Sequence, residues 1–149
     1  MSTDFPSPVV LERFEINRDS VQRVFEAACL QVGLDDHGAL IVTDCGLRYV
    51  LIPDKDGDDI VMFVVFGFSD SSSDEAQISA AAEINATYKM VRAAVHYQHD
   101  ADGPHVLVLD YLLCTAGGVT PKTIISAWQR FATIVRSAIR EASVSAVLA

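Results

Sequence analysis

The sequence predicts a single α+β domain, built from a helix, three antiparallel strands, a second helix, a two-stranded hairpin and a last helix. Three observations predict this order. Apolar residues recur at helical spacing near both ends of the chain, short apolar runs separated by turn residues fill the middle, and no long linker interrupts them. With 149 residues, the chain has the length of one domain.

The first helix is expected over residues 18–32, after a flexible N-terminal arm over residues 1–17. Asp19 or Ser20 can cap it, and Gly33 can end it. Its apolar positions are spaced by three and four, namely Val21, Val24, Phe25, Cys29 and Val32. This spacing is typical of an amphipathic helix with one buried side.

Three strands are expected next, over residues 39–45, 47–52 and 60–68, with turn residues between them. The third run is apolar at both alternating sets of positions. A strand with one face in water alternates instead, so we expect both faces of this strand to be covered.

The second helix is expected to begin with a capping box, in which Ser72 accepts from the Glu75 amide, and to end near Ala86. Strand-like runs follow at 90–98 and 105–113, joined by a turn at 99–104.

The last helix is expected to be capped by Thr120, with Pro121 in its first turn. One apolar stripe follows it, made of Ile124, Trp128, Phe131, Val135 and Ala138. The domain is expected to span residues 18–142, and residues 143–149 to fray.

Composition limits the classes of function. Half of the residues are hydrophobic, yet no apolar run has the roughly 18 residues of a membrane span, and the N-terminus lacks the pattern of a signal peptide. The net charge of −9 disfavours binding to nucleic acid. The three cysteines lack the spacing of a zinc site or a disulfide framework, so we expect each to be a small buried side chain. We expect the protein to be cytoplasmic.

Three local patterns could bind an ion, and each favours a structural interpretation. Asp54, Asp56 and Asp58 alternate like calcium ligands, but Asp59 and Val65 replace the required glycine and glutamate. The histidines 96, 99 and 105 cluster around the second hairpin, where a metal is possible but exposed turn residues are expected. The glycines at 117–118 match no phosphate-binding motif and indicate a sharp turn. We therefore predict no metal and no cofactor.

Four residues are candidates for interaction or for lining a pocket: Arg92, His96, Asp110 and Trp128. Asp110 interrupts an apolar strand, where it is either half-buried or in solvent beside Arg92 of the paired strand. Trp128 lies on the helical stripe and is expected in the core. Motifs of known catalytic centres do not occur, so we predict a protein that is not an enzyme.

The chain resembles the YbjN family of bacterial sensory transduction regulators in four features: the loop and helix leading to Asn85, the hairpin around residues 89–92, the turn Gly117-Gly118-Val119-Thr120, and the helix with Trp128 and Phe131. The resemblance covers residues 19–140. It implies a fold similar to that of type III secretion chaperones, which are small, acidic, dimeric proteins that hold extended segments of their clients. It implies no catalytic residue.

The leading hypothesis is a homodimeric protein-binding module, regulatory or chaperone-like, with an unidentified protein client. Three helices cannot cover both faces of the sheet, so a second subunit is expected on the uncovered apolar face. The client would bind at apolar sheet surface or at an open strand edge. One alternative is a small-molecule sensor or enzyme, with a pocket between the sheet and the last helix to which Arg92, His96 or Asp110 contributes. Another is a dimer interface that binds nothing else.

Overall fold

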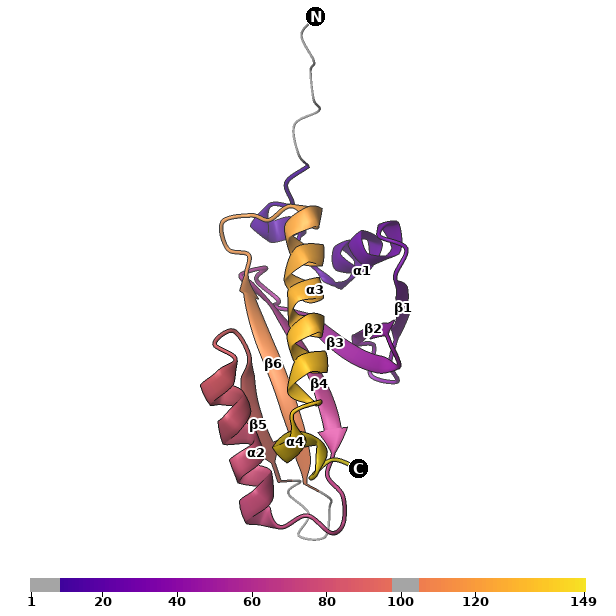
Figure 1. Ribbon diagram of the computed structural model, residues 1–149. Coiled ribbons are helices and arrows are strands. Elements are labelled where there is room, and N and C mark those ends of the chain that lie inside the picture. Colours follow the sequence, from indigo (N-terminus) through magenta and orange to yellow (C-terminus); the bar gives the residue numbers. More distant parts are fainter. Residues whose placement is uncertain (1–8, 98–104) are drawn as a thin grey trace, which may run out of the picture.

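The computed structural model describes residues 9–97 and 105–149 and shows one six-stranded antiparallel sheet with its helices on one side (Figure 1). A 3-10 helix, Arg13–Glu15, precedes the first α-helix. The helices are α1 (Arg18–Ala27), α2 (Asp74–Thr87), α3 (Pro121–Ala138) and α4 (Ala142–Ser145). The strands are β1 (Gln31–Leu34), β2 (Leu40–Asp44), β3 (Leu47–Pro53), β4 (Asp59–Gly67), β5 (Arg92–His96) and β6 (Val106–Cys114).

The strands lie in the order β1-β2-β3-β4-β6-β5. In Figure 1, α3 crosses in front of β4 and β6, α1 lies above β2 and β3 and beside β1, and α2 runs beside β5. We call the face under α1 and α3 the inner face and the opposite one the outer face. The predicted α+β class and order of elements are confirmed, with one strand more than expected.

The additional strand is β1, where the sequence predicted the end of a helix. The first helix ends at Ala27, and Cys29 turns the chain with a φ of +60°. Val32 fits the helical spacing but pairs with Val42 of β2. Helical spacing over one turn cannot exclude a short strand, and here the pairing with β2 decides.

The second helix also begins one residue later than predicted. Ser73 is its cap and accepts from the Ala76 amide. The hydroxyl of Ser72 instead donates to the Ser69 carbonyl and accepts from the side-chain Nε2 of Gln77. The turn predicted at 99–104 lies outside the described residues.

Both ends of the described chain pack against the domain. Leu11, in the expected arm, forms a β-bridge with Val119, and Ile16 is buried. At the other end, where fraying was expected, Val144 of α4 is fully buried and Leu148 bridges to Phe68. Burial of these apolar side chains stabilises both segments.

The core lies between the inner face and the helices. Trp128 of α3 packs edge to face on Phe25 of α1 and on Tyr49 of β3, each at 5.8 Å between ring centroids. This confirms Trp128 as a core residue. Two helices, α1 and α3, and the sheet therefore meet at one side chain.

The cysteines differ from the prediction, since Cys29, Cys45 and Cys114 are all exposed. Cys29 and Cys45 occupy turn positions with φ of +60° and +50°, so backbone turns and not side-chain burial determine where they lie. Among residues 9–97 and 105–149, no helix is long and apolar enough to span a membrane.

Candidate functional site

The outer face of the sheet is a surface of apolar rows that the strand register aligns. One row runs Val50, Phe63, Asp110 and Arg92 across β3, β4, β6 and β5. The next row on one side is Ile52, Val61 and Leu112, and that on the other side is Val65, Val108 and Ala94. Within these three rows, only Asp110 and Arg92 are charged, and they lie together at one end of the first row.

These rows are open to solvent. Exposed fractions reach 45% for Ile52, 47% for Val65 and 56% for Leu112, while the alternate β4 residues Ile60, Met62 and Val64 are buried on the inner face. Contiguous apolar surface of this kind marks an interaction site more often than scattered single residues do. The run that is apolar on both faces therefore has one covered face and one open face.

Arg92 and Asp110 form an ion pair at the end of the outer face. Arg92 Nη2 donates to Asp110 Oδ2 at 2.7 Å, and its Nε donates to both carboxylate oxygens at 3.1 Å. The hydrogen bonds to Asp110 raise the pKa of Arg92. Asp110 lies beside Arg92, as one of the two interpretations held, but its side chain is only 21% exposed, so it is also half-buried, as the other held.

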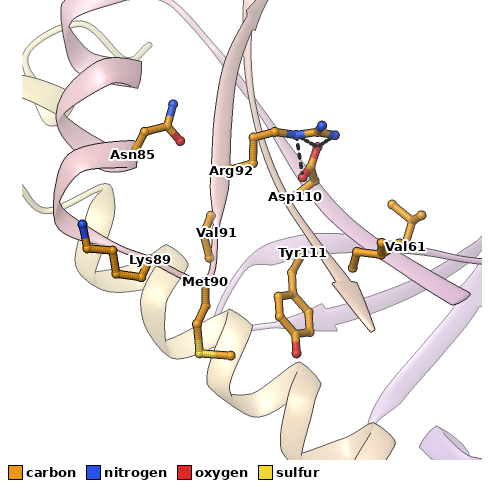
Figure 2. Close-up of a pocket in the computed structure, with 9 residues that line it drawn as sticks. Val61, Asn85, Lys89, Met90, Val91, Arg92, Asp110 and Tyr111 are labelled. Carbon is orange, nitrogen blue, oxygen red and sulfur yellow. Dashed lines mark hydrogen bonds and ion pairs between the residues drawn. The ribbon is translucent and has the colours of Figure 1, made fainter. Parts of the chain in front are cut away.

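An open cavity of about 430 Å³ borders this ion pair. Figure 2 shows Arg92 and Asp110 joined at one side, Val61 beyond them, and Met90 and Lys89 on the segment that follows α2. The outer face thus ends in a hollow that has both apolar and cationic groups.

His96 does not join this cavity. It lies at the end of β5, opposite Val106 of β6, and is exposed. His105 packs on Tyr97 at 4.3 Å between ring centroids and contacts Gln77 Oε1 at 3.1 Å. Within the described parts of the chain, no three His, Cys, Asp or Glu side chains gather as a metal site would require. His99 lies outside those parts.

The structure therefore brings together two of the four candidate residues, Arg92 and Asp110. Trp128 belongs to the core on the inner face, and His96 stands apart on β5. Two aspartates of the β3–β4 turn accept hydrogen bonds from other groups of the chain. Asp54 accepts from the Asp56 amide at 3.1 Å, and Asp58 binds Arg13 Nη2 at 3.0 Å.

The open edge at β1 was missed because the strand itself was missed. The Asp35 amide donates to the Ala39 carbonyl, and β1 continues in the same register, so Gly33 and Gln31 bond to β2. The amides and carbonyls of Val32 and Leu34 consequently point away from the sheet. In the described parts of the chain, no further strand pairs with them.

The architecture defines the class of the protein, which is an α+β domain with the fold of type III secretion chaperones. The crystal structure of the Yersinia pestis type III secretion chaperone SycH, in complex with a stable fragment of YscM2, is similar with a TM-score of 0.50 and 15% identity, over 82% of this chain and 96% of that one. The HopA1-SchA chaperone-effector complex has a TM-score of 0.50 and 10% identity, over 78% and 88%. At these identities the likeness shows the fold.

The family follows from the sequence. The YbjN family model, described as "Putative bacterial sensory transduction regulator", matches residues 17–143, and the chain belongs to this family. The crystal structure of YbjN from E. coli is similar with a TM-score of 0.74 and 16% identity, over 88% of this chain and 94% of that one. The comparison with curated proteins found no match.

Proposed function

We propose that this protein is a non-enzymatic module that binds an extended segment of another protein, in a regulatory or chaperone-like role, and that it acts as a homodimer in the cytoplasm. The observation that carries the proposal is the uncovered apolar outer face, with Ile52, Val65 and Leu112 open to solvent. Two solved structures of the same fold are complexes with other protein chains. Their partners motivate the proposal for this chain.

In this proposal a second copy covers the outer face. A two-fold interface is self-complementary, so the apolar rows of one subunit can pack on those of the other. The Arg92–Asp110 pair lies at the end of the rows, where it can stay hydrated at the rim of the interface. A stable dimer would bury roughly 1,200–2,000 Å² in total.

The client segment is assigned to the open edge of β1. An extended peptide can pair with the outward amides and carbonyls of Val32 and Leu34 and so add a strand to the sheet. This edge has none of the usual protection by lysine or proline. The edge and the outer face are distinct surfaces, so dimerisation leaves the edge available.

Light scattering over a dilution series tests the dimer. We expect the wild-type chain to have the mass of a dimer and Leu112→Glu that of a monomer, because a buried unpaired charge disfavours the interface. Ile78→Glu is the matched control, since Ile78 of α2 is 52% exposed and Leu112 is 56% exposed. Circular dichroism checks that both variants fold. A monomeric wild type, or dissociation by Ile78→Glu alone, contradicts the proposed interface.

Substitution of Leu34 tests the edge. Leu34→Pro removes the outward amide, whereas Leu34→Ala shortens the same side chain and keeps that amide. We expect proteins captured by the wild type from native cells to be retained by Leu34→Ala and lost by Leu34→Pro. Equal capture by both variants would place the client elsewhere.

A further inference from the structure

The strand β6 extends beyond β5, and part of its own edge is therefore open. On one side β6 pairs with β4 along its whole length. On the other side the pairing with β5 stops where Arg92 lies opposite Asp110. In the described parts of the chain, no strand pairs with β6 beyond Asp110 on that side. Residues 111–114 therefore have a neighbouring strand on one side only.

The register shows which backbone groups point into this gap. The Thr115 amide donates to the Asp58 carbonyl at 2.7 Å, so the odd-numbered residues of β6 point their amides and carbonyls toward β4. The backbone of Ala93 bonds to α2 and not to β6, which gives the same alternation on the β5 side. Leu112 and Cys114 consequently point their amides and carbonyls into the gap. No described residue supplies them with a hydrogen-bond partner.

The cavity of about 430 Å³ lies along this open edge. Met90 and Val91 line one side of it, and Tyr111 and Leu112 of β6 line the other (Figure 2). An extension of β5 would place Met90 opposite Leu112, but residues 89–90 form a turn instead. The volume lies within the range of about 300–1,000 Å³ that is usual for ligand pockets. A few residues of an extended chain therefore have room beside β6. We call this open edge and its cavity the β6 notch.

The free charges beside the notch are cationic. Lys89 lines the cavity, and Arg130 of α3 lies next to it, with Nη1 3.9 Å from Met90 Sδ. Within the described chain, neither of the two cations forms an ion pair. The one acidic residue of the lining, Asp110, is already paired with Arg92. In a chain with a net charge of −9, this local excess of positive charge favours an acidic partner.

We propose that the β6 notch binds a short acidic segment of a partner protein as an added antiparallel strand in line with β5. The amides and carbonyls of the segment would bond to those of Leu112 and Cys114, and its carboxylates would pair with Lys89 and Arg130. The notch is a second edge site, apart from β1, and it does not rest on the proposed function. Leu112 contributes its backbone here, whereas its side chain belongs to the outer face.

A titration with a synthetic peptide tests the notch. The probe is a capped pentapeptide of alternating glutamate and valine with glutamate at both ends, and ¹H–¹⁵N spectra of the full chain follow it at constant ionic strength. We expect saturable shifts of the Leu112 and Cys114 amides. Absence of these shifts overturns the proposal, and so do shifts confined to Val32 and Leu34, which would place the peptide at the β1 edge.

Three matched peptides separate backbone pairing from charge. The same sequence with N-methylated backbone amides keeps both charge and side chains but cannot donate to the edge, so its binding should be lost. Glutamine in place of glutamate should weaken binding about fivefold, as expected for the loss of two exposed ion pairs. Lysine in place of glutamate should weaken it further. Equal affinity of the methylated, glutamine or lysine peptide overturns the proposal.

A charge reversal in the protein provides the matching variant. Lys89→Glu should weaken the acidic peptide at least fivefold and should strengthen the lysine peptide relative to the wild type. Lys122→Glu is the control, because it makes the same change of charge at an exposed lysine of α3 that does not line the cavity. It should leave both affinities within about twofold. Circular dichroism checks that both variants fold. Equal effects of the two variants would reduce the preference to net charge and would overturn the assignment to the notch.

Discussion

Asn85 of α2 gives the sharpest test of how the sheet is closed at β5. Its side-chain Nδ2 donates to the Ala93 carbonyl at 2.8 Å, and its Oδ1 accepts from the Ala93 amide at 2.7 Å. The side-chain amide thus takes the place of a neighbouring strand. Replacing Asn85 with alanine removes both hydrogen-bond partners of the Ala93 backbone, and Ala93 is a buried residue.

The expected cost follows from these two bonds. Each contributes about 1 kcal/mol to the free energy of unfolding, and Asn85 is itself exposed, so water can partly replace it. Alanine has a higher helix propensity than asparagine, and this offsets about 0.5 kcal/mol of the loss in the free energy of unfolding. Asn85→Ala should therefore lower the free energy of unfolding by about 1.5 kcal/mol and the midpoint of thermal unfolding by roughly 3–6 °C.

Urea unfolding followed by circular dichroism measures this loss, with Ser79→Ala on an exposed position of the same helix as control. We expect an unchanged m-value and a lower midpoint for Asn85→Ala. A loss below about 0.5 kcal/mol would refute the reasoning, because it would show that solvent satisfies Ala93 as well as Asn85 does.

Three further predictions concern stability. Gly57→Ala should destabilise more than Gly46→Ala in urea unfolding, because φ is +74° and +77° at the two sites, but an added Cβ would lie 1.8 Å from the Arg13 carbonyl oxygen only at Gly57; equal losses would contradict this. Val144→Ala should cost about 1.5–3 kcal/mol, since the side chain is fully buried, whereas the exposed Ser145→Ala should cost little; a loss near zero would mean that α4 is not docked in solution. Deprotonation of tyrosine occurs near pH 10 in the unfolded chain but only at about 12 for Tyr49 in the fold. Stability should therefore be complete below about pH 10 and fall as the pH rises toward 12, and Tyr49→Phe should remove that component of the decline.

The sequence predicted the elements whose patterns are long or whose ends carry turn residues. The α3 cap at Thr120 followed by Pro121 is where it was expected, and the strands around Gly46 fall within one or two residues of their predicted bounds. β1 was missed for a physical reason. Its four residues carry too little pattern to compete with the helical spacing before them, and they are a strand because β2 offers a partner.

The candidate site shows the same limit. The hairpin of β5 and β6 allowed the Arg92–Asp110 pair to be expected, because residues on one face of paired strands become neighbours. The open backbone of Leu112 and Cys114 could not be foreseen. The sequence predicted a strand from residue 90, which would have paired with Leu112, and only the structure shows that β5 begins at Arg92.

One edge and one face of the sheet are covered, whereas the other edge and the other face are open. This asymmetry connects the structure with binding. At β5 a side chain of α2 occupies the edge, and on the inner face α1 and α3 cover the core. At β1 the backbone of Val32 and Leu34 is open, and on the outer face the alternate residues of β4 are open. Exposed edges and apolar sheet surface promote aggregation, and proteins usually protect them. A chain that covers one edge and one face by specific contacts but leaves the other edge and face open supports the proposal that the open pair is surface for a client segment and a second copy.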